Sequence, residues 1–337
     1  MHEHDPIRVV HWGLDPVGLT AARLVWRRPG LMPVGAICRG VGKDLGDLMG
    51  LGERLGVTIN NDPAAVLHTT APDVTIISFD RPLTEVAPMV EQAMEAGSNV
   101  ICLAGEMTYP WAVDPKLAER LDDMAYAHGV TVLGTGINPG FILDSLVIAL
   151  TGCCLDVERI KASRVIGAGP GQVRGHVGFE QSIHLIADAL GWPLERVEQE
   201  QAAGTHHAAH GYIDGRVRII LEQVEQVGGE AEGIATGDFI DIEGQPPVRL
   251  AIQPEIDEVK GAAALAVNMI SAVLLSGPGL KSMAEMPLPR AVLGDLRQMA
   301  DLKGLTVDEA LARGWQGSSL ERANSIHLRE KGESAQG

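Results

Sequence analysis

The sequence predicts an α/β protein in which an N-terminal domain with a parallel sheet is followed by a second, α+β domain with a largely antiparallel sheet. Two observations support this prediction. Over the first 135 residues, short apolar runs alternate with amphipathic helical patterns, which is typical of parallel strands covered by helices on both faces. After Gly134, longer β-type runs follow one another with few helices between them.

Apolar runs and capping signals define the elements of the N-terminal domain. Asp62-Pro63 and Asp114-Pro115 each place an acidic N-cap before a proline at the first helical position, and Gly97 ends the helix between them. We expect helices at residues 19–27, 63–69, 83–96 and 115–128. We expect strands at residues 7–11, 31–38, 74–79, 99–102 and 131–133.

The second domain is predicted from its hairpin signal and its β-type runs. Asp214-Gly215 is a strong turn signal between two of these runs. We expect strands at residues 160–166, 208–213, 217–224, 239–242 and 248–252, and helices at residues 141–150, 179–190, 261–275, 289–302 and 306–313. The predicted division is residues 1–135 for the first domain, 136–288 for the second, and 289–337 for a C-terminal helical segment that packs back on the first.

Composition and charge exclude several classes of protein. The formal net charge of −17 repels a phosphate backbone, so no nucleic-acid partner is expected. The N-terminus lacks the pattern of a signal peptide, and the apolar stretch 261–275 is too short to span a bilayer. The four cysteines lie in apolar surroundings without metal-ligand spacing, as in a cytoplasmic protein with reduced thiols. We therefore expect a cytoplasmic protein without a membrane partner.

The turn after the first strand resembles a phosphate-binding turn. In the dinucleotide fingerprint the first glycine makes the tight turn, the second lets the backbone approach the pyrophosphate, and the third lets helix and strand pack closely. Here the second glycine is replaced by Asp15, whose carboxylate repels a pyrophosphate by about 1 to 4 kcal/mol, although Asp15 is also a good N-cap for the helix that follows. The candidate cofactor-binding residues of this turn are Gly13, Leu14, Asp15, Pro16, Val17 and Gly18.

The end of the second strand bears on the choice between NADP and NAD. An acidic residue there would bind the adenosine ribose, but the sequence has Arg39 instead. Because a guanidinium matches the geometry of a phosphate, Arg39 favours NADP over NAD, and Lys43 is a second candidate. The alternative is that Arg39 is a solvated loop residue.

Several blocks of the sequence resemble a known family. They stand in the family's order over most of residues 7–295, and the block 134–141, with its Asn-Pro-Gly-Phe end, is the most specific. The chain is similar to the 2,4-diaminopentanoate dehydrogenases and the related bacterial amine dehydrogenases, which themselves resemble dihydrodipicolinate reductases. The other blocks are residues 28–31, 42–46, 175–179, 211–215 and 266–270.

The resemblance implies NAD(P)-dependent oxidative deamination of an amine, or reductive amination of a carbonyl with ammonia in reverse, by a homodimer. It places the family's catalytic glutamate at Glu106, just past a parallel strand, where α/β sheets bind their ligands. A base is needed there because hydride leaves carbon only after the ammonium has lost a proton. By the same resemblance Asn138 faces the nicotinamide, and the backbone at Ser78, Phe79, Ala104 and Gly105 passes along the dinucleotide. Phe141, Arg164 and His176 are then expected to line the substrate pocket, and a structural role on its glycine-flanked turn is the open alternative for His176.

Other interpretations stay open at this point. The loop between Arg164 and His176 is short and rich in glycine, so we do not carry over the diamine substrate. His206, His207 and His210 lie beside a β-type run without acidic or thiol ligands nearby, and no metal site is predicted. The alternatives to an amine dehydrogenase are an imine or carbonyl reductase on the same fold and a dinucleotide-binding protein without catalysis, which Asp15 keeps open.

Overall fold

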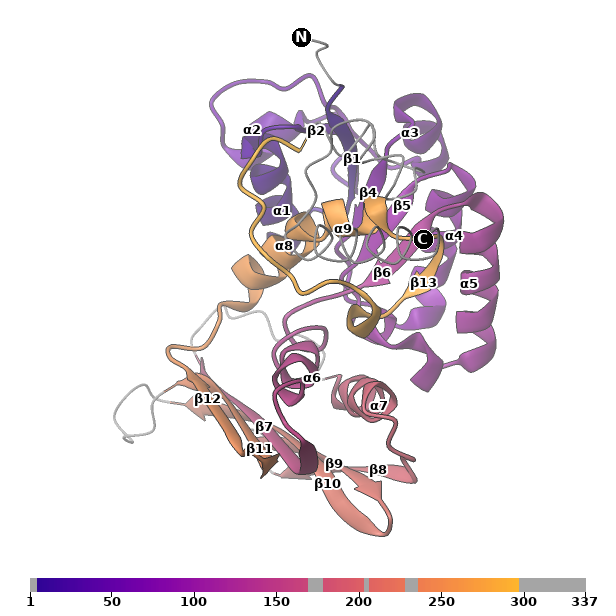
Figure 1. The fold of residues 1–337 in the computed structure, drawn as a ribbon. Coiled ribbons are helices and arrows are strands. Elements are labelled where there is room, and N and C mark those ends of the chain that lie inside the picture. The colour runs from indigo at the N-terminus through magenta and orange to yellow at the C-terminus, as the bar shows by residue number, and fades with distance from the viewer. Residues whose placement is uncertain (1–4, 169–177, 203–205, 228–235, 297–337) are drawn as a thin grey trace, which may run out of the picture.

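The structure, a computed structural model, describes residues 5–168, 178–202, 206–227 and 236–296. Within them the chain forms two sheets, one of seven strands and one of six. Figure 1 shows the six-stranded sheet below the larger N-terminal part, with two helices, α6 (Ser145–Thr151) and α7 (Phe179–Ala189), between them. The predicted fold class, a parallel Rossmann sheet followed by an α+β domain, is confirmed.

The first sheet has the strand order of a dinucleotide-binding domain. Its order is β13-β6-β5-β4-β1-β2-β3, and every neighbouring pair runs parallel. The order reverses at β1, and this switch point opens the crevice in which Rossmann folds bind their ligands. The strands are β1 (Ile7–Trp12), β2 (Leu31–Ile37), β3 (Ile59–Asn60), β4 (Val74–Ile77), β5 (Asn99–Cys102), β6 (Thr131–Gly134) and β13 (Gly279–Lys281).

Helices cover both faces of this sheet. One face packs against α3 (Pro63–Thr70), α4 (Leu83–Glu95) and α5 (Pro115–His128). The other packs against α1 (Pro16–Arg27), α8 (Glu258–Asn268) and α9 (Ile270–Leu275). A short helix, α2 (Leu45–Met49), closes a small apolar cluster beside β2 and β3.

The second sheet has the order β12-β11-β7-β10-β9-β8 and is antiparallel except between β7 and β10. The predicted hairpin is confirmed: Asp214 and Gly215 both have positive φ between β9 and β10. One face of the sheet packs on α6 and α7. Its strands are β7 (Asp156–Ala168), β8 (Arg196–Ala202), β9 (His206–Ile213), β10 (Arg216–Val227), β11 (Gly237–Gln245) and β12 (Val248–Ile252).

The chain returns to the first sheet well before its C-terminal segment. Helices α8 and α9 pack on that sheet and β13 adds to its edge beside β6. We therefore propose to count residues 258–296 with the Rossmann domain, whereas the sequence placed the return at residue 289. The helices α8 and α9 together, Glu258–Leu275, have 18 residues and a mean hydropathy of 1.5, enough for a membrane span by length and composition. Half of that stretch is buried inside the protein, as in a core helix.

Several predicted elements differ from those observed. Residues 289–296 are not helical, so this part of the predicted helix 289–302 is wrong; instead Leu296 is buried in the core and donates its N–H to the carbonyl of Pro29. Glycine at 294 disfavours a helix, and the contact of Leu296 with Pro29 holds the segment in another course. The remainder of that helix and residues 306–313 lie outside the described residues. The elements α2, β3, β8 and β13 were not predicted.

Candidate active site

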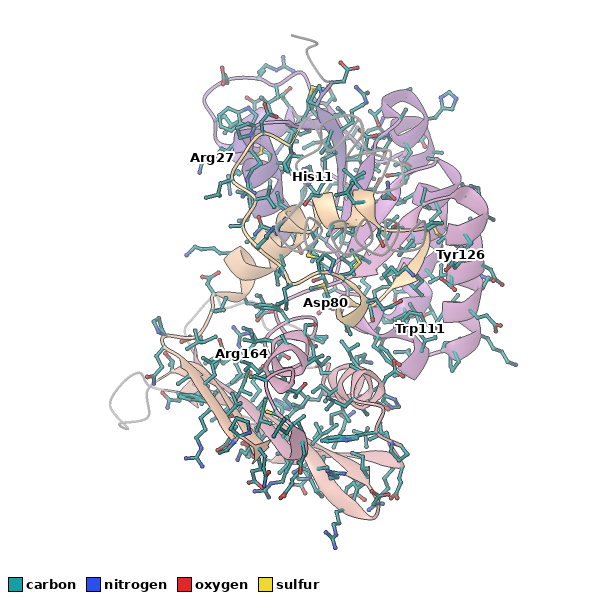
Figure 2. The ribbon with its side chains drawn as sticks, in the orientation of Figure 1. His11, Arg27, Asp80, Trp111, Tyr126 and Arg164 are labelled. Carbon is teal, nitrogen blue, oxygen red and sulfur yellow. The ribbon has the colours of Figure 1, made fainter. Side chains whose placement is uncertain are left out.

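A crevice in the Rossmann part, on the side that faces the second domain, holds the candidate site. Its walls come from the turn before α1, the carboxyl ends of β4 and β5, the segment after β6 and the first turns of α8. Figure 2 shows Asp80 at the edge of the Rossmann part that faces the second domain, and Arg164 at the opposing edge of the second sheet. We call this space the cleft. It is lined by Asp15, Val17, Ser78, Asp80, Leu103, Gly105, Gly136, Ile137, Asn138, Pro139, Glu258 and Ala262.

The predicted phosphate turn lies at the top of the first helix, at the edge of this cleft. Gly13 has a φ of +111°, and a Cβ there would lie 2.4 Å from the Oγ of Ser78, so only glycine fits. The expected N-cap is confirmed: Asp15 Oδ1 accepts the N–H of Gly18 at 2.7 Å, with Pro16 at the first helical position. The carboxylate therefore occupies a helix N-terminal donor that a phosphate would otherwise use.

Two unpartnered polar atoms at the cleft fit a nicotinamide dinucleotide. Ser78 is 3% exposed and Asn138 7% exposed, and neither Ser78 Oγ nor Asn138 Oδ1 has a hydrogen-bond partner. Buried polar atoms are rarely left unpaired, so a ligand with its own donors and acceptors suits them. The amide nitrogen of Asn138 donates to Gln223 Oε1 at 3.2 Å, which fixes the direction in which that side chain faces. These residues and the turn at Gly13 suit the cofactor.

The predicted catalytic residue Glu106 lies beside the cleft but is engaged elsewhere. It belongs to the 3-10 turn η1 (Gly105–Thr108) that follows β5, and Gly105 lines the cleft. The Glu106 Oε2 accepts the N–H of Leu83, the first residue of α4, at 2.6 Å. The α4 N-cap, Pro82, makes no side-chain capping bond, so Glu106 satisfies a helix donor that would otherwise be open. A second short turn, η2 (Pro110–Ala112), follows η1.

The turn that carries Glu106 packs closely on the next strand. A Cβ at Gly134, the last residue of β6, would lie 1.8 Å from the carbonyl oxygen of Met107. Only a glycine permits that approach, which gives a physical reason for the first residue of the block 134–141. The block therefore sets both the position of η1 and, through Asn138, the floor of the cleft.

A buried ionic cluster supports the cleft from the second domain. Arg164 of β7 is 2% exposed; its Nε lies 3.5 Å from Asp238 Oδ1 and its Nη1 3.4 Å from Glu258 Oε2. Burial raises the pKa of Asp238 and of Glu258, while the charge of Arg164 lowers both pKa values. The predicted pocket residue Arg164 thus does not appear among the lining residues described; it is covered by Glu258, which does.

The other predicted residues are distributed unevenly. Of the residues of the predicted cofactor turn, Val17 lines the cleft, whereas Leu14 packs beside α2. Phe79 and Ala104 belong to the core around α4 and α5, and Phe141 packs against the core of the second domain. Arg39 is exposed just beyond β2, and His176 lies outside the described residues. Asp80, Asp238 and Glu258 were not predicted, because three separated acids that meet only in the fold form no local motif.

The two domains also meet beside η1 and η2. The pKa of Tyr109 is raised to about 12, chiefly by burial and then by the charge of Asp188, to which its hydroxyl is hydrogen-bonded. Its ring lies 5.4 Å from that of Trp111 and 6.3 Å from that of His184 on α7. This aromatic contact joins the segment that carries Glu106 to the second domain.

Comparison with known proteins identifies the family. The model of the 2,4-diaminopentanoate dehydrogenase C-terminal domain matches residues 166–203 and 197–302. A 2,4-diaminopentanoate dehydrogenase from Acetoanaerobium sticklandii is 32% identical, over 88% of this chain and 97% of that enzyme. The chain belongs to the 2,4-diaminopentanoate dehydrogenase family. This confirms the family that the sequence blocks indicated.

A more distant sequence relative and a solved structure are also similar to this chain. An amine dehydrogenase from Streptomyces virginiae is 24% identical over 85% of this chain and 98% of that protein. The structure of an amine dehydrogenase from Mycobacterium smegmatis superposes with a TM-score of 0.76, at 23% identity, over 87% of this chain and 99% of that one. As a member of the 2,4-diaminopentanoate dehydrogenase family the protein is an oxidoreductase, and its cleft suits a nicotinamide dinucleotide.

Proposed function

We propose that this protein is an NADP-preferring amine dehydrogenase, which oxidises an amine to a ketone or aldehyde with release of ammonia and catalyses reductive amination in reverse. The charge of the cleft carries the proposal. Among its described lining residues Asp15, Asp80 and Glu258 are carboxylates and none is basic. Such a lining favours cations, and both the substrate ammonium and the oxidised nicotinamide ring are cationic. The relatives, a 2,4-diaminopentanoate dehydrogenase and an amine dehydrogenase, support the same reaction class.

The substrate's chemistry divides between the cofactor and the protein. The nicotinamide, when bound, accepts the hydride from the amine carbon. Before that, the ammonium must lose a proton, and we propose Glu106 as the acceptor, because it follows β5 next to the cleft residue Gly105. Its carboxylate holds the N–H of Leu83 in the free protein. Catalytic contacts often form only in the substrate complex, and this contact must loosen for Glu106 to reach an ammonium.

The preference for NADP rests on Arg39. This residue is exposed just beyond β2, where Rossmann domains contact the adenosine ribose, and no acidic residue follows the strand there. The exposed guanidinium can meet a 2′-phosphate in a bidentate manner without breaking an existing ion pair of its own among the contacts described.

We also propose a cytoplasmic homodimer that forms through the second sheet. The face opposite α6 and α7 carries the half-buried apolar side chains of Ile220, Val224 and Phe239, because their neighbours Ile219, Leu221 and Ile240 belong to the core. The Lys161–Glu222 ion pair lies among them. A sheet face that mixes apolar side chains with an ion pair suits a subunit interface. A cytoplasmic location agrees with Cys102, a fully buried free thiol. Light scattering should show a dimer that Val224→Arg dissociates.

The test of the proposed function combines turnover with variants. The purified protein is incubated with NADP⁺ and a panel of small aliphatic amines, and both reduced cofactor and carbonyl product are quantified. Equal amounts of the two are expected. Glu106→Gln should lower kcat by about 100-fold or more while cofactor affinity changes little. The control is Glu95→Gln, which removes a carboxylate at the far end of α4. Cofactor binding without turnover of any amine would contradict the proposal.

A further inference from the structure

Glu258 is a cleft carboxylate that the sequence did not indicate. It is the first residue of α8, where the chain passes from the second sheet back to the Rossmann domain. Its side chain is 33% exposed and lines the cleft, whereas those of its neighbours Arg164 and Asp238 are 2% and 0% exposed. Glu258 is therefore the one member of this ionic cluster that can meet a substrate.

The cluster holds more negative charge than its cation neutralises. One guanidinium, that of Arg164, faces the two carboxylates of Asp238 and Glu258. The Arg164 Nη1 and Asp238 Oδ1 atoms also lack hydrogen-bond partners, so these ion pairs are looser than a bidentate contact. Asp238 is further held by the N–H of Ile256 at 3.0 Å. Of the two carboxylates, only that of Glu258 is exposed to the cleft.

The position of Glu258 depends on a row of polar residues across the second sheet. In register across neighbouring strands lie His207 of β9, Gln223 of β10, Arg164 of β7 and Asp238 of β11. Two members of the row connect to the cleft: Gln223 accepts from the Asn138 side chain, and Arg164 faces Glu258. The backbone N–H of Asn138 in turn donates to the carboxylate of Glu258. Both cleft residues are therefore fixed by the same row.

Buried ionic groups of this kind contribute little to folding. Replacement of a buried ion pair by apolar residues is often neutral or stabilising, because desolvation offsets the attraction between the charges. The arrangement is better explained by chemistry in the cleft. Burial raises the pKa of Glu258, opposed by Arg164 and the N–H of Asn138, and reinforced by the charges of Asp238 and Asp80. A carboxylate whose pKa is raised is a stronger base, which suits a residue that takes up a proton and later returns it.

Amine oxidation needs a second proton acceptor after the hydride has left. Resting on the proposed function, we propose that Glu258 is the acid–base residue of the hydrolytic half of the reaction, and that Arg164 is its positioning residue. Water adds to the iminium carbon, the C=N π pair returns to nitrogen, and one water proton moves to the Glu258 carboxylate. Glu258 returns this proton to nitrogen, takes the hydroxyl proton as the C–N bond breaks, and ammonia leaves from the new carbonyl. The last proton passes to solvent.

The experiment separates the two halves of the reaction in the reductive direction. A preformed cyclic imine, 2-methyl-1-pyrroline, needs only hydride from NADPH, whereas 2-butanone with ammonium chloride must first condense. Glu258→Gln should lower the amination of 2-butanone by about 100-fold more than it lowers reduction of the imine, as expected for loss of acid–base catalysis. Glu106→Gln is the matched control and should lower both rates together. NADPH binding, followed by tryptophan fluorescence, should be retained in both variants.

The positioning role has its own variant. Arg164→Lys keeps the charge but shortens its reach, so it should lower the ratio of ketone amination to imine reduction. Glu258→Asp keeps the carboxylate and should restore part of the ratio that Glu258→Gln loses. A Glu258→Gln enzyme that loses both rates equally, or neither, overturns the inference and leaves the proposed function standing. A wild-type protein that binds NADPH but converts neither compound overturns the proposed function and the inference with it.

Discussion

The carboxylate of Asp15 accepts the N–H of Gly18 at 2.7 Å, across the turn in which Rossmann domains bind a pyrophosphate. The contact has two opposite consequences. It caps α1 and so stabilises the helix that borders the cleft. It also places a negative charge where the cofactor's phosphates approach and occupies one of the helix N–H donors.

The first prediction separates these two effects. Asp15→Asn keeps a good N-cap and removes the charge, so the melting temperature should change little. NADPH should bind about 5-fold more tightly, corresponding to about 1 kcal/mol of relieved repulsion at the surface. Fluorescence titration measures the affinity. Asp15→Ala, which loses the cap as well, should cost about 1 kcal/mol of stability. Weaker binding by Asp15→Asn would mean that the carboxylate assists the cofactor.

The second prediction concerns the choice between NADP and NAD. Arg39→Ala should raise the Kd for NADPH by about 10-fold or more, because a charge-assisted contact to the 2′-phosphate is lost. The Kd for NADH should hardly change. Arg27→Ala is the control for a general loss of positive charge, because Arg27 lies at the end of α1 that is farther from the phosphate turn. Equal effects of Arg39→Ala on the two cofactors would show that this residue does not contact the 2′-phosphate.

The third prediction concerns stability at acidic pH. His11 on β1 is fully buried, neither ring nitrogen has a partner, and burial lowers its pKa from 6.5 to about 4. Below pH 6.5 the unfolded chain takes up a proton that the folded protein refuses. His11 therefore does not lower the free energy of unfolding above pH 6.5. As the pH falls from 6.5 to about 4, it lowers that free energy by about 3 kcal/mol.

Its test is a series of urea denaturation curves between these two pH values. His11→Leu should flatten the loss of unfolding free energy over that interval, because the replacement does not titrate. His128→Leu, at the exposed end of α5, should leave the loss as it is in the wild type. A wild-type slope in His11→Leu would assign the acid sensitivity to other groups.

The fourth prediction concerns the packing of η1. Gly134→Ala places a methyl group against the Met107 carbonyl, 1.8 Å away before relaxation, and should destabilise the protein by about 3 kcal/mol. The same shift moves Glu106, so amine turnover should fall further than cofactor binding. Gly277→Ala is the matched control, because a Cβ there meets no atom within 4 Å. Similar stability of the two variants would show that η1 yields without cost.

The elements that have local signals in the sequence could be predicted. The caps Asp62 and Asp114, each followed by proline, start α3 and α5 as predicted, and the Asp214-Gly215 turn joins β9 to β10. The return of the chain to the first sheet could not be predicted, because the three residues of β13 are recognised as a strand only by their pairing with β6. The helix predicted at residues 289–302 followed its apolar spacing, and contacts such as that of Leu296 with Pro29 outweigh it over residues 289–296.

The candidate site divides in the same way. Gly13, Asp15 and Gly18 were recognisable because the fingerprint turn is a continuous segment beside a strand. Glu258 and Asp80 were not, since they are separated by 178 positions in the sequence and meet only because α8 packs back on the Rossmann sheet. The hydrogen bond from the Leu83 N–H to Glu106 could not be predicted either, because a lone glutamate after a strand does not reveal which helix it caps.

The transfer of deuterium from the amine carbon to the nicotinamide tests the proposed amine dehydrogenase reaction most directly. An amine that the protein oxidises is prepared with deuterium on the carbon that bears nitrogen and is incubated with the protein and NADP⁺. The account predicts one deuterium in each reduced nicotinamide formed; a ketone product then has no deuterium at its carbonyl carbon, whereas an aldehyde from a dideuterated carbon keeps one. Reduced cofactor without deuterium would contradict direct hydride transfer from the amine carbon.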